Sequence, residues 1–310
     1  MASFLEGQVA IVTGAGRGIG RAEALALAAA GARVVVNDLG GALDGRDNPG
    51  ASGSATPAEE TVAEIRKRGG EAVANAESVA SYAGAARIVQ QALDSFGQLD
   101  ILVNNAGNLR IGMIEEHSEE DFDQIVQVHL KGTFNTCRHA VPIMKKQKHG
   151  RIINTASNQW RAPSGQLAYA AAKGGIVSLT WELAFELDKH GVTANAIAPF
   201  ASTRMTEHHE ARNQSLRGSG EISERRLASF EPRTDPSMVP PMIVYLASKH
   251  AAQVNGCVFR VGGDKIGRFA HPEEFATVFH DIEEGPWNLE QLVRILPQTL
   301  FARGSKAPHL

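Results

Sequence analysis

Short, continuous apolar runs alternate along most of this chain with longer segments whose apolar residues recur at helical spacing. The strand-length runs cover residues 9–13, 34–37, 71–76, 101–104, 151–155, 192–197 and 258–261. The helical segments between them cover residues 22–30, 61–67, 84–96, 119–148, 166–190 and 238–247. Strands that are apolar on both faces are typical of a parallel sheet covered by helices on both sides. The pattern predicts an α/β fold with a doubly wound parallel sheet, whose ligands bind at its carboxyl edge.

Three stretches interrupt this alternation. Residues 40–58 have the Gly, Pro, Ser and Asp content of a solvated surface loop. Residues 200–235 hold six Arg and five Glu, and they are either a mobile lid over the substrate or a plain loop. Residues 269–310 form a predicted amphipathic extension that covers this subunit or its neighbour. Its apolar residues form two stripes around Gly285 and Pro286, namely Phe275, Val278, Phe279 and Ile282, then Leu289, Leu292, Val293 and Leu296.

The charge balance and the two cysteines limit the classes of protein. With 31 Lys and Arg against 34 Asp and Glu, the net charge of −3 lacks the positive excess of nucleic-acid or anionic-membrane binders. A small-molecule partner is therefore expected. Cys137 and Cys257 allow neither a disulfide framework nor a four-cysteine zinc site, and the His208–His209 pair lacks a third ligand at a recognisable spacing. We expect no metal site and a reducing compartment.

The start of the chain and the length of its apolar runs indicate where in the cell the protein is expected. The first six residues lack the basic start and apolar run of a signal peptide, and the longest apolar stretch covers only residues 24–32. These features predict a cytoplasmic protein that does not span a membrane.

A glycine-rich turn follows the first apolar run. Residues 13–20 read Thr-Gly-Ala-Gly-Arg-Gly-Ile-Gly, which departs from G-x-G-x-x-G because Ile19 holds the third glycine position. The wider pattern T-G-x-x-x-G-x-G is satisfied by Gly14, Gly18 and Gly20. Such glycines let the backbone approach a pyrophosphate at the positive start of a helix. The turn predicts a nucleotide site.

The second apolar run ends at Asp38, eighteen residues after Gly20. A carboxylate there can accept hydrogen bonds from both hydroxyls of an adenosine ribose and repel a 2′-phosphate. This favours NAD over NADP as the cofactor, although Arg17 can soften the preference and a solvated strand-end aspartate is the alternative. Val79, after the third run, is expected to flank the adenine. Residues 104–107, Asn-Asn-Ala-Gly, can tie a strand end to neighbouring loops.

A Tyr-x-x-x-Lys pattern occurs twice, at Tyr169–Lys173 and at Tyr245–Lys249. By chance alone such a pattern is expected about once in ten chains of this composition, so the pattern decides nothing by itself. Tyr245 lies among apolar residues of a helical segment, which favours a packing role. Tyr169 follows Ser157 and a nucleotide motif, and residues four apart share a helix face. We therefore interpret Ser157, Tyr169 and Lys173 as catalytic.

These three side chains suggest proton and hydride transfer. Lowering the pKa of a tyrosine from about 10 to about 7 requires roughly 4 kcal/mol in favour of the phenolate. Lys173 and a cationic nicotinamide ring can both supply it. Ser157 would hold the substrate oxygen while Tyr169 removes the hydroxyl proton and a hydride passes to the nicotinamide. The sequence thus predicts an NAD-dependent oxidoreductase that interconverts a secondary alcohol and a ketone.

Together these residues resemble the short-chain dehydrogenase/reductase family, and the resemblance covers residues 1–268, which we expect to be a single Rossmann-like domain. The residues that carry the resemblance are 13–20, Asp38, 104–107, Ser157, Tyr169, Lys173 and Ala198-Pro199. Within the family, residues 36–41, 128–132, 203–206 and 261–263 look like the hydroxyacyl-CoA dehydrogenase units of peroxisomal multifunctional enzyme type 2 and bacterial relatives. That likeness implies a hydroxyacyl-CoA or steroid-like substrate. The arginines of 200–235 can meet coenzyme A phosphates or belong to a solvated loop.

The resemblance also implies roles for single residues. His129 occupies the position of the family's catalytic Asn, so a proton relay would pass an imidazole able to titrate near pH 6.5. Ser157 lies 12 residues before Tyr169 instead of the usual 13, which keeps Ser164 as an alternative. The residues implied to contact the cofactor are Gly14, Arg17, Gly18, Ile19, Gly20, Asp38, Leu39, Val79, Asn105, Ala106, Gly107, Tyr169, Lys173, Pro199 and Thr203.

The helical segments 119–148 and 166–190 resemble those through which family members form dimers and tetramers, so a homo-oligomer is expected. Two other functions stay open. A non-catalytic nucleotide sensor can use the same fold, although it would not need a base such as Tyr169. An NADP-dependent ketoacyl reductase would differ at Asp38.

Overall fold

The computed structural model describes residues 3–41, 55–112, 114–161, 166–206, 234–274 and 276–300 of the 310. The chain divides into two units, Met1–Phe269 and Ala270–Leu310. Several predicted features lie outside the described residues. They are most of the surface loop 40–58, most of the segment 200–235 that was expected to be a lid or a plain loop, the alternative serine Ser164, the His208–His209 pair and Phe275.

The first unit is built on an eight-stranded sheet in the order β3-β2-β1-β4-β5-β6-β7-β8. The strands are β1 (Val9–Thr13), β2 (Arg33–Asn37), β3 (Ala72–Asn75), β4 (Ile101–Asn104), β5 (Gly150–Thr155), β6 (Val192–Pro199), β7 (Val258–Gly262) and β8 (Lys265–Arg268). All pairs are parallel except β7 with β8. The predicted doubly wound sheet is confirmed, and its order reverses between β1 and β4, the place where such sheets bind ligands.

Helices cover both faces of this sheet. They are α1 (Gly18–Ala29), α2 (Pro57–Lys67), α3 (Tyr82–Phe96), α4 (Glu119–Val126), α5 (Gly132–Gln147), α6 (Leu167–Leu187) and α9 (Pro240–Ala247). Short 3-10 turns are η1 (Ile114–Glu116), η3 (Asn158–Trp160), η4 (Asp188–His190), η5 (Pro236–Met238) and η6 (Lys249–Ala251).

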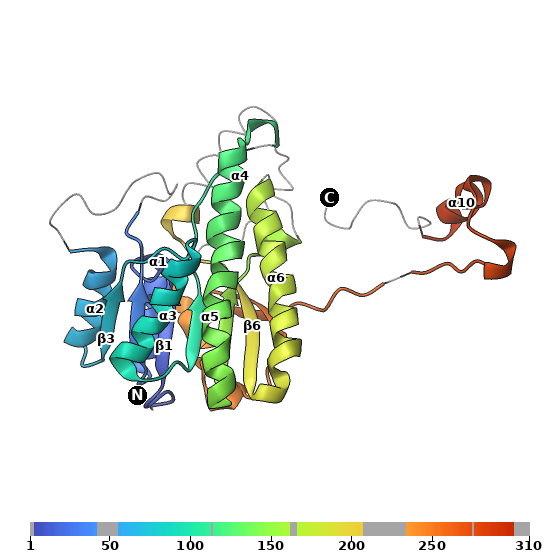
Figure 1. The fold of residues 1–310 in the computed structure, drawn as a ribbon. Helices are drawn as coiled ribbons and strands as arrows, with labels where there is room; N and C mark the ends of the chain where they lie inside the picture. Colours follow the sequence, from blue (N-terminus) through green and yellow to red (C-terminus); the bar gives the residue numbers. More distant parts are fainter. Residues whose placement is uncertain are drawn as a thin grey trace. The chain divides into compact units, whose positions relative to one another are not determined.

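The two helical layers bury opposite sets of strand residues. Helices α1, α2 and α9 pack on Ala10, Val12 and the matching positions of neighbouring strands. Helices α3, α5 and α6 pack on the alternate set, including Val9 and Ile11, and lie in front of the sheet in Figure 1. Because neighbouring strand residues point to opposite faces, a strand that is covered on both sides, such as β1, is buried along its whole length.

The elements differ from the predicted ones in a few places. Strand β8 was not predicted because its residues are mostly polar and exposed, so no apolar run marks it. The predicted helix 119–148 is a continuous helical run, but it contains a π-helical segment, η2 (Gln127–Lys131). Helix α2 begins four residues earlier than predicted because Thr56 and Glu59 form a capping box and Pro57 is the first helical residue.

The described part of the second unit, 270–274 and 276–300, contains the α-helix α10 (Leu289–Ile295) and the 3-10 turns η7 (Ile282–Glu284) and η8 (Leu296–Gln298). The first predicted amphipathic stripe is not a helix, since residues 276–281 have no regular structure. Asp281 caps η7, which Gly285 and Pro286 follow directly, so no helix can extend through this segment. Phe279 and Ile282 are 90% and 89% exposed.

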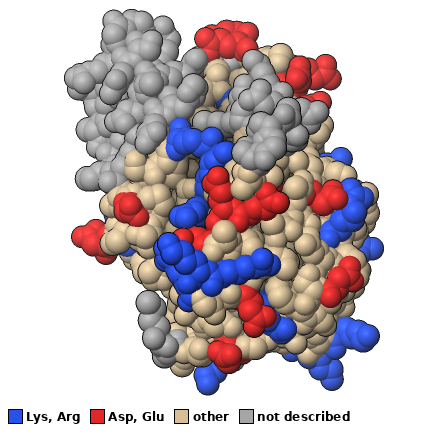
Figure 2. All heavy atoms as spheres, turned by 90° about the vertical axis from the view of Figure 1, so that its left-hand side faces the viewer, with Lys and Arg blue, Asp and Glu red and all other residues tan. Residues whose placement is uncertain are grey.

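Basic and acidic side chains lie side by side on the face that includes α2 and β3 (Figure 2). Among the helices that the structure describes, none is long and apolar enough to span a membrane. Within the same described ranges, no three His, Cys, Asp or Glu side chains are grouped so that they could hold a metal ion.

Candidate functional site

A cavity of about 680 Å³ opens at the carboxyl edge of the sheet, lined largely by segments that follow β1 to β6. It brings together every residue that the sequence predicted for the site. These are Gly14, Arg17, Gly18, Ile19, Gly20, Asp38, Leu39, Val79, Asn105, Ala106, Gly107, His129, Ser157, Tyr169, Lys173, Pro199 and Thr203. Predicted residues as far apart in the chain as Gly14 and Thr203 therefore line the same cavity.

The glycine turn is packed too closely to hold side chains. Gly14 has φ of +64°, and a Cβ there would lie 2.8 Å from the Ala106 Cα. A Cβ on Gly20 would lie 2.3 Å from the Gly14 carbonyl oxygen. The chain thus turns from β1 into α1 within a few residues, so the free N–H groups at the start of α1 border the cavity.

Asn105 ties the turn to the end of β4. Its side-chain amide Nδ2 donates to the carbonyl oxygens of Thr13 and Gly14 over 3.0 and 3.1 Å. The Thr13 hydroxyl in return accepts the backbone N–H groups of Asn105 and Ala106, each at 3.1 Å. Two neighbouring strand ends are therefore fixed to each other beneath the cavity.

Asp38 stands at the end of β2 with both carboxylate oxygens engaged. Oδ2 accepts the Gly16 N–H at 2.8 Å, and Oδ1 accepts the Gly40 N–H at 2.7 Å. A carboxylate offers about four lone-pair positions, and the described residues occupy two of them. The carboxylate is thus held in place at the edge of the cavity.

Ser157, Tyr169 and Lys173 meet above the end of β5. Tyr169 and Lys173 are one turn apart on α6, with the Lys173 Nζ 5.4 Å from the Tyr169 ring centre. The Lys173 ammonium donates to the Thr155 carbonyl oxygen, and the Ser157 side chain is hydrogen-bonded to the Tyr169 hydroxyl. Ser157 lies two residues beyond β5 despite its one-residue-shorter spacing from Tyr169.

Burial shifts the pKa values of Tyr169 and Lys173 in the directions that favour the neutral form of each side chain. It raises the pKa of Tyr169 to about 12, and the hydrogen bond from Ser157 offsets only part of this. It lowers the pKa of Lys173, which is only 3% exposed, to about 7. The phenol is therefore neutral in the protein alone at neutral pH. The predicted phenolate, which requires the cationic nicotinamide ring as well as Lys173, remains a prediction.

His129 lies in the π-helical segment and is 2% exposed. Its Nε2 atom is 2.9 Å from the Asn108 carbonyl oxygen, and its ring meets the Tyr169 ring edge-on at 5.1 Å. Burial, followed by the charge of Lys173, lowers its pKa to about 3. The expectation that this imidazole titrates near pH 6.5 is wrong, because a buried cation next to Lys173 is unfavourable.

The sequence missed a group of amide side chains around the catalytic end of the cavity. They are Asn108, Gln124, Asn158, Gln159 and Gln166. Single amides carry no spacing pattern, so only their position beside His129, Ser157 and Tyr169 identifies them. They make this end of the cavity polar.

The second Tyr-x-x-x-Lys pattern lies elsewhere. Tyr245 is on α9, does not line the cavity and is 43% exposed. It is less buried than the packing role predicted, since it faces outward while its neighbours Ile243 and Leu246 face the core.

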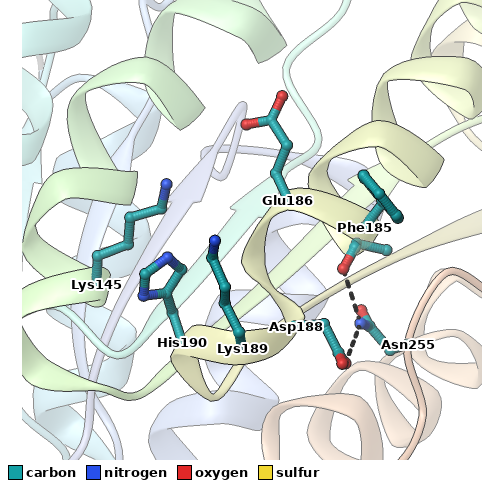
Figure 3. A pocket seen from close by; sticks show the side chains of 8 residues that line it. Lys145, Phe185, Glu186, Asp188, Lys189, His190 and Asn255 are labelled. Atoms are coloured by element: carbon teal, nitrogen blue, oxygen red, sulfur yellow. Dashed lines mark hydrogen bonds between the residues drawn. The ribbon is translucent and has the colours of Figure 1, made fainter.

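A second hollow lies at the surface between the ends of α5 and α6 (Figure 3). Lys145, Lys189 and His190 border it, and Asn255 donates to the Asp188 carboxylate at 3.1 Å on its far side. None of the predicted site residues lines it, and its neighbour Phe185 is largely exposed. This hollow is therefore separate from the candidate site.

Comparison with known proteins agrees with this geometry. A family profile described as short chain dehydrogenase matches residues 8–214. Mouse peroxisomal multifunctional enzyme type 2 is 41% identical over 264 residues, which cover 85% of this chain and 32% of that longer protein. A hydroxyacyl-CoA dehydrogenase of Mycobacterium tuberculosis is 38% identical over 277 residues, covering 86% of this chain and 81% of the relative. The crystal structure of a short chain dehydrogenase from Mycobacterium avium superposes with a TM-score of 0.78, at 41% identity and covering 96% of this chain and 95% of the other.

The chain belongs to the short-chain dehydrogenase/reductase family of oxidoreductases, whose members use nicotinamide dinucleotides. Within that family it resembles peroxisomal multifunctional enzyme type 2 and its bacterial relatives, as the motifs predicted.

Proposed function

We propose that this protein is an NAD-dependent dehydrogenase that interconverts a secondary alcohol and a ketone, with Tyr169 as the acid and base. The observation that carries the proposal is the meeting of Ser157, Tyr169 and Lys173 in the same cavity as the glycine turn. A nucleotide sensor would have no use for a buried phenol bonded to a serine and backed by a lysine.

The cavity residues fit NAD. The side-chain-free turn at Gly14 and Gly20 leaves room for a pyrophosphate against the start of α1. The two lone-pair positions of Asp38 that the described residues do not occupy suit the two ribose hydroxyls, and its negative charge disfavours a 2′-phosphate. Bound NAD would supply the hydride acceptor and a positive charge at the catalytic end.

The chain's own residues would handle the proton. Ser157 donates to the substrate oxygen and fixes it beside the Tyr169 phenol oxygen. As a phenolate, Tyr169 takes the alcohol proton during oxidation, and as a neutral phenol it gives a proton to the ketone oxygen during reduction. Lys173, fixed to the Thr155 carbonyl, keeps its ammonium below the Tyr169 ring. The amide-lined end of the cavity would bind the rest of the substrate.

The raised pKa of Tyr169 sets a condition on this proton transfer. Lowering it from about 12 to about 7 requires roughly 7 kcal/mol of stabilisation of the phenolate. Lys173 can supply only part of this, so the positive charge of the oxidised cofactor must contribute the rest. For ketone reduction, the neutral phenol is already the acid form.

We infer that the substrate is a hydroxyacyl-CoA or a steroid-like alcohol. Relatives named hydroxyacyl-CoA dehydrogenase support this assignment.

We further infer a homo-oligomer that forms through the helices α4 to α6, and a reducing compartment such as the cytoplasm. Exposed apolar side chains on these helices, among them Phe122, Phe134 and Phe185, support a subunit contact there. The single buried thiol, Cys137, and the distant Cys257 support the compartment. Sedimentation velocity at several protein concentrations tests the oligomer, and a monomer at all of them would contradict it.

The function is tested by following NADH formation with a panel of secondary alcohols that includes hydroxyacyl-CoA and steroid alcohols. Turnover with a member of the panel is expected. Tight binding of NADH without turnover on any of them would favour a sensor instead.

The cofactor preference has its own test, made by calorimetry with NAD and NADP. We expect NAD to bind more tightly and the substitution Asp38→Ala to narrow the difference. Equal affinities in the unmodified protein would contradict the choice of NAD and favour an NADP-dependent ketoacyl reductase.

A further inference from the structure

The loop between β3 and α3 forms one wall of the cofactor cavity. Residues 77–80, Glu-Ser-Val-Ala, all line the cavity and belong to no helix or strand. Loops without regular hydrogen bonding depend on outside contacts for their position. The contacts that hold this loop therefore control the shape of that wall.

One side of the loop is held from the sheet. The Asn37 side-chain amide, at the end of β2, donates to the Glu77 carbonyl oxygen at 2.8 Å and to the Asn75 side chain at 2.8 Å. These bonds fix the first residues of the loop. The bonds from Asn37 do not reach Val79 and Ala80, which are held by contacts with another element.

Asn135 holds the other side. It lies on α5 and is completely buried, and its Nδ2 donates to the Val79 carbonyl oxygen at 2.9 Å and more weakly to that of Ala80 at 3.4 Å. Asn135 does not itself line the cavity. Any effect it has on a ligand must pass through the backbone of Val79.

The packing around Val79 explains why this bond matters. Gly132 lies almost one turn before Asn135 on α5, and a Cβ there would come within 2.8 Å of the Val79 Cγ2. Helix α5 thus lies against the Val79 side chain on one turn and binds its backbone on the next. The helix sets both the distance and the orientation of this part of the wall.

We propose that Asn135 is a positioning residue for the cofactor, acting through Val79 on the adenine end of the cavity. The proposal rests on the proposed function, in which Val79 flanks the adenine. A purely structural role would weaken folding without distinguishing one end of the cofactor from the other. The two roles therefore differ in a measurable way.

The test is the substitution Asn135→Leu, which keeps the size of the side chain and removes the donor. Calorimetry would give the dissociation constants of NADH, of AMP as the adenine half and of nicotinamide mononucleotide as the other half. Loss of one buried hydrogen bond corresponds to about tenfold in affinity, or ~1.4 kcal/mol. We expect that loss for NADH and AMP, no change for nicotinamide mononucleotide, and a raised KM for NAD with kcat preserved.

Asn195→Leu is the matched control. Asn195 is also buried, at 1% exposed, and its Nδ2 donates to the Val254 carbonyl oxygen at 2.7 Å. Unlike Val79, Val254 does not line the cavity. This variant should lose similar stability and keep its affinity for all three ligands. Asn135→Ala replaces the leucine variant if that one does not fold, and its results are interpreted in the same way.

Each outcome decides the inference. Unchanged affinity of the Asn135 variant for NADH and AMP would overturn it, and so would an equal loss for AMP and nicotinamide mononucleotide. Failure of the unmodified protein to bind NADH at all would instead contradict the proposed function.

Discussion

Tyr169 and Lys173 owe their chemistry to burial as much as to each other. The surrounding protein holds the pKa of the phenol at about 12 and that of the amine at about 7, so both are easier to keep neutral than their free counterparts. The direction of neither pKa shift can be derived from the Tyr-x-x-x-Lys spacing, because the burial of these two side chains depends on the packing of α6 against β5 and η2. The sequence predicted which side chains meet, and only the structure shows how their protonation is biased.

Another buried residue, Glu23 on α1, has a protonation effect on stability. It has no hydrogen-bond partner among the described residues, and burial raises its pKa to about 8 from 4.5. Because the folded-state pKa is the higher one, its contribution to the free energy of unfolding is intact below pH 4.5 and is lost as the pH rises through 8. The full loss corresponds to about 5 kcal/mol.

Urea unfolding of the variant Glu23→Gln tests this. The variant should match the unmodified protein at acidic pH and exceed its free energy of unfolding by several kcal/mol above pH 8. Glu182→Gln, at an exposed position of α6, serves as the control. A difference between Glu23→Gln and the unmodified protein that does not vary with pH would contradict the assignment.

At the scale of elements, the sequence is most informative where one physical signal dominates. The seven predicted strands are all present, and β1, β4 and β5 are buried along their whole length. Strand β8 lacks a continuous apolar run and pairs only at the edge of the sheet. The π-helical turn around His129 has no sequence signal either, since it depends on how the ring packs against Gly107 and Tyr169.

The connection from β1 to α1 gives a prediction at this scale. A Cβ on Gly16 would lie 2.5 Å from the Pro57 Cβ and 2.8 Å from the Asp38 Cγ. The substitution Gly16→Ala must therefore displace the Asp38 carboxylate or the start of α2. We expect it to weaken NADH binding at least about tenfold, measured by fluorescence titration.

Gly174→Ala is the control for that substitution. A Cβ on Gly174, within α6, would meet nothing within 4 Å. Replacing a helical glycine by alanine adds up to about 1 kcal/mol of stability, and NADH affinity should not change. Equal binding by the Gly16 and Gly174 variants would show that the turn tolerates a side chain after all.

At the scale of the whole molecule, the site belongs to one of the two units. Among the residues that the structure describes, those that line the cavity come from the first unit, ending with Arg260. The sequence shows the apolar residues of the extension, but a single sequence does not identify the surface that they pack against. We propose that residues 1–268 form the cofactor-binding domain and 269–310 a separate extension.

Removal of residues 270–310 tests this division. The shortened protein should bind NADH with a dissociation constant within about threefold of that of the full chain, because none of the described lining residues lies in 270–310. Circular dichroism would confirm that the shortened chain is folded. A folded protein with strongly weakened NADH binding would place part of the site in the extension.

The central claim is that the Tyr169 hydroxyl transfers the substrate proton, and the substitution Tyr169→Phe tests it most directly. General acid–base catalysis contributes about 10²- to 10⁴-fold, so kcat/KM for NADH formation should fall by at least about a hundredfold. Affinity for NADH should stay the same, since the ring and its contact with His129 remain. Turnover that survives this substitution undiminished would contradict the account.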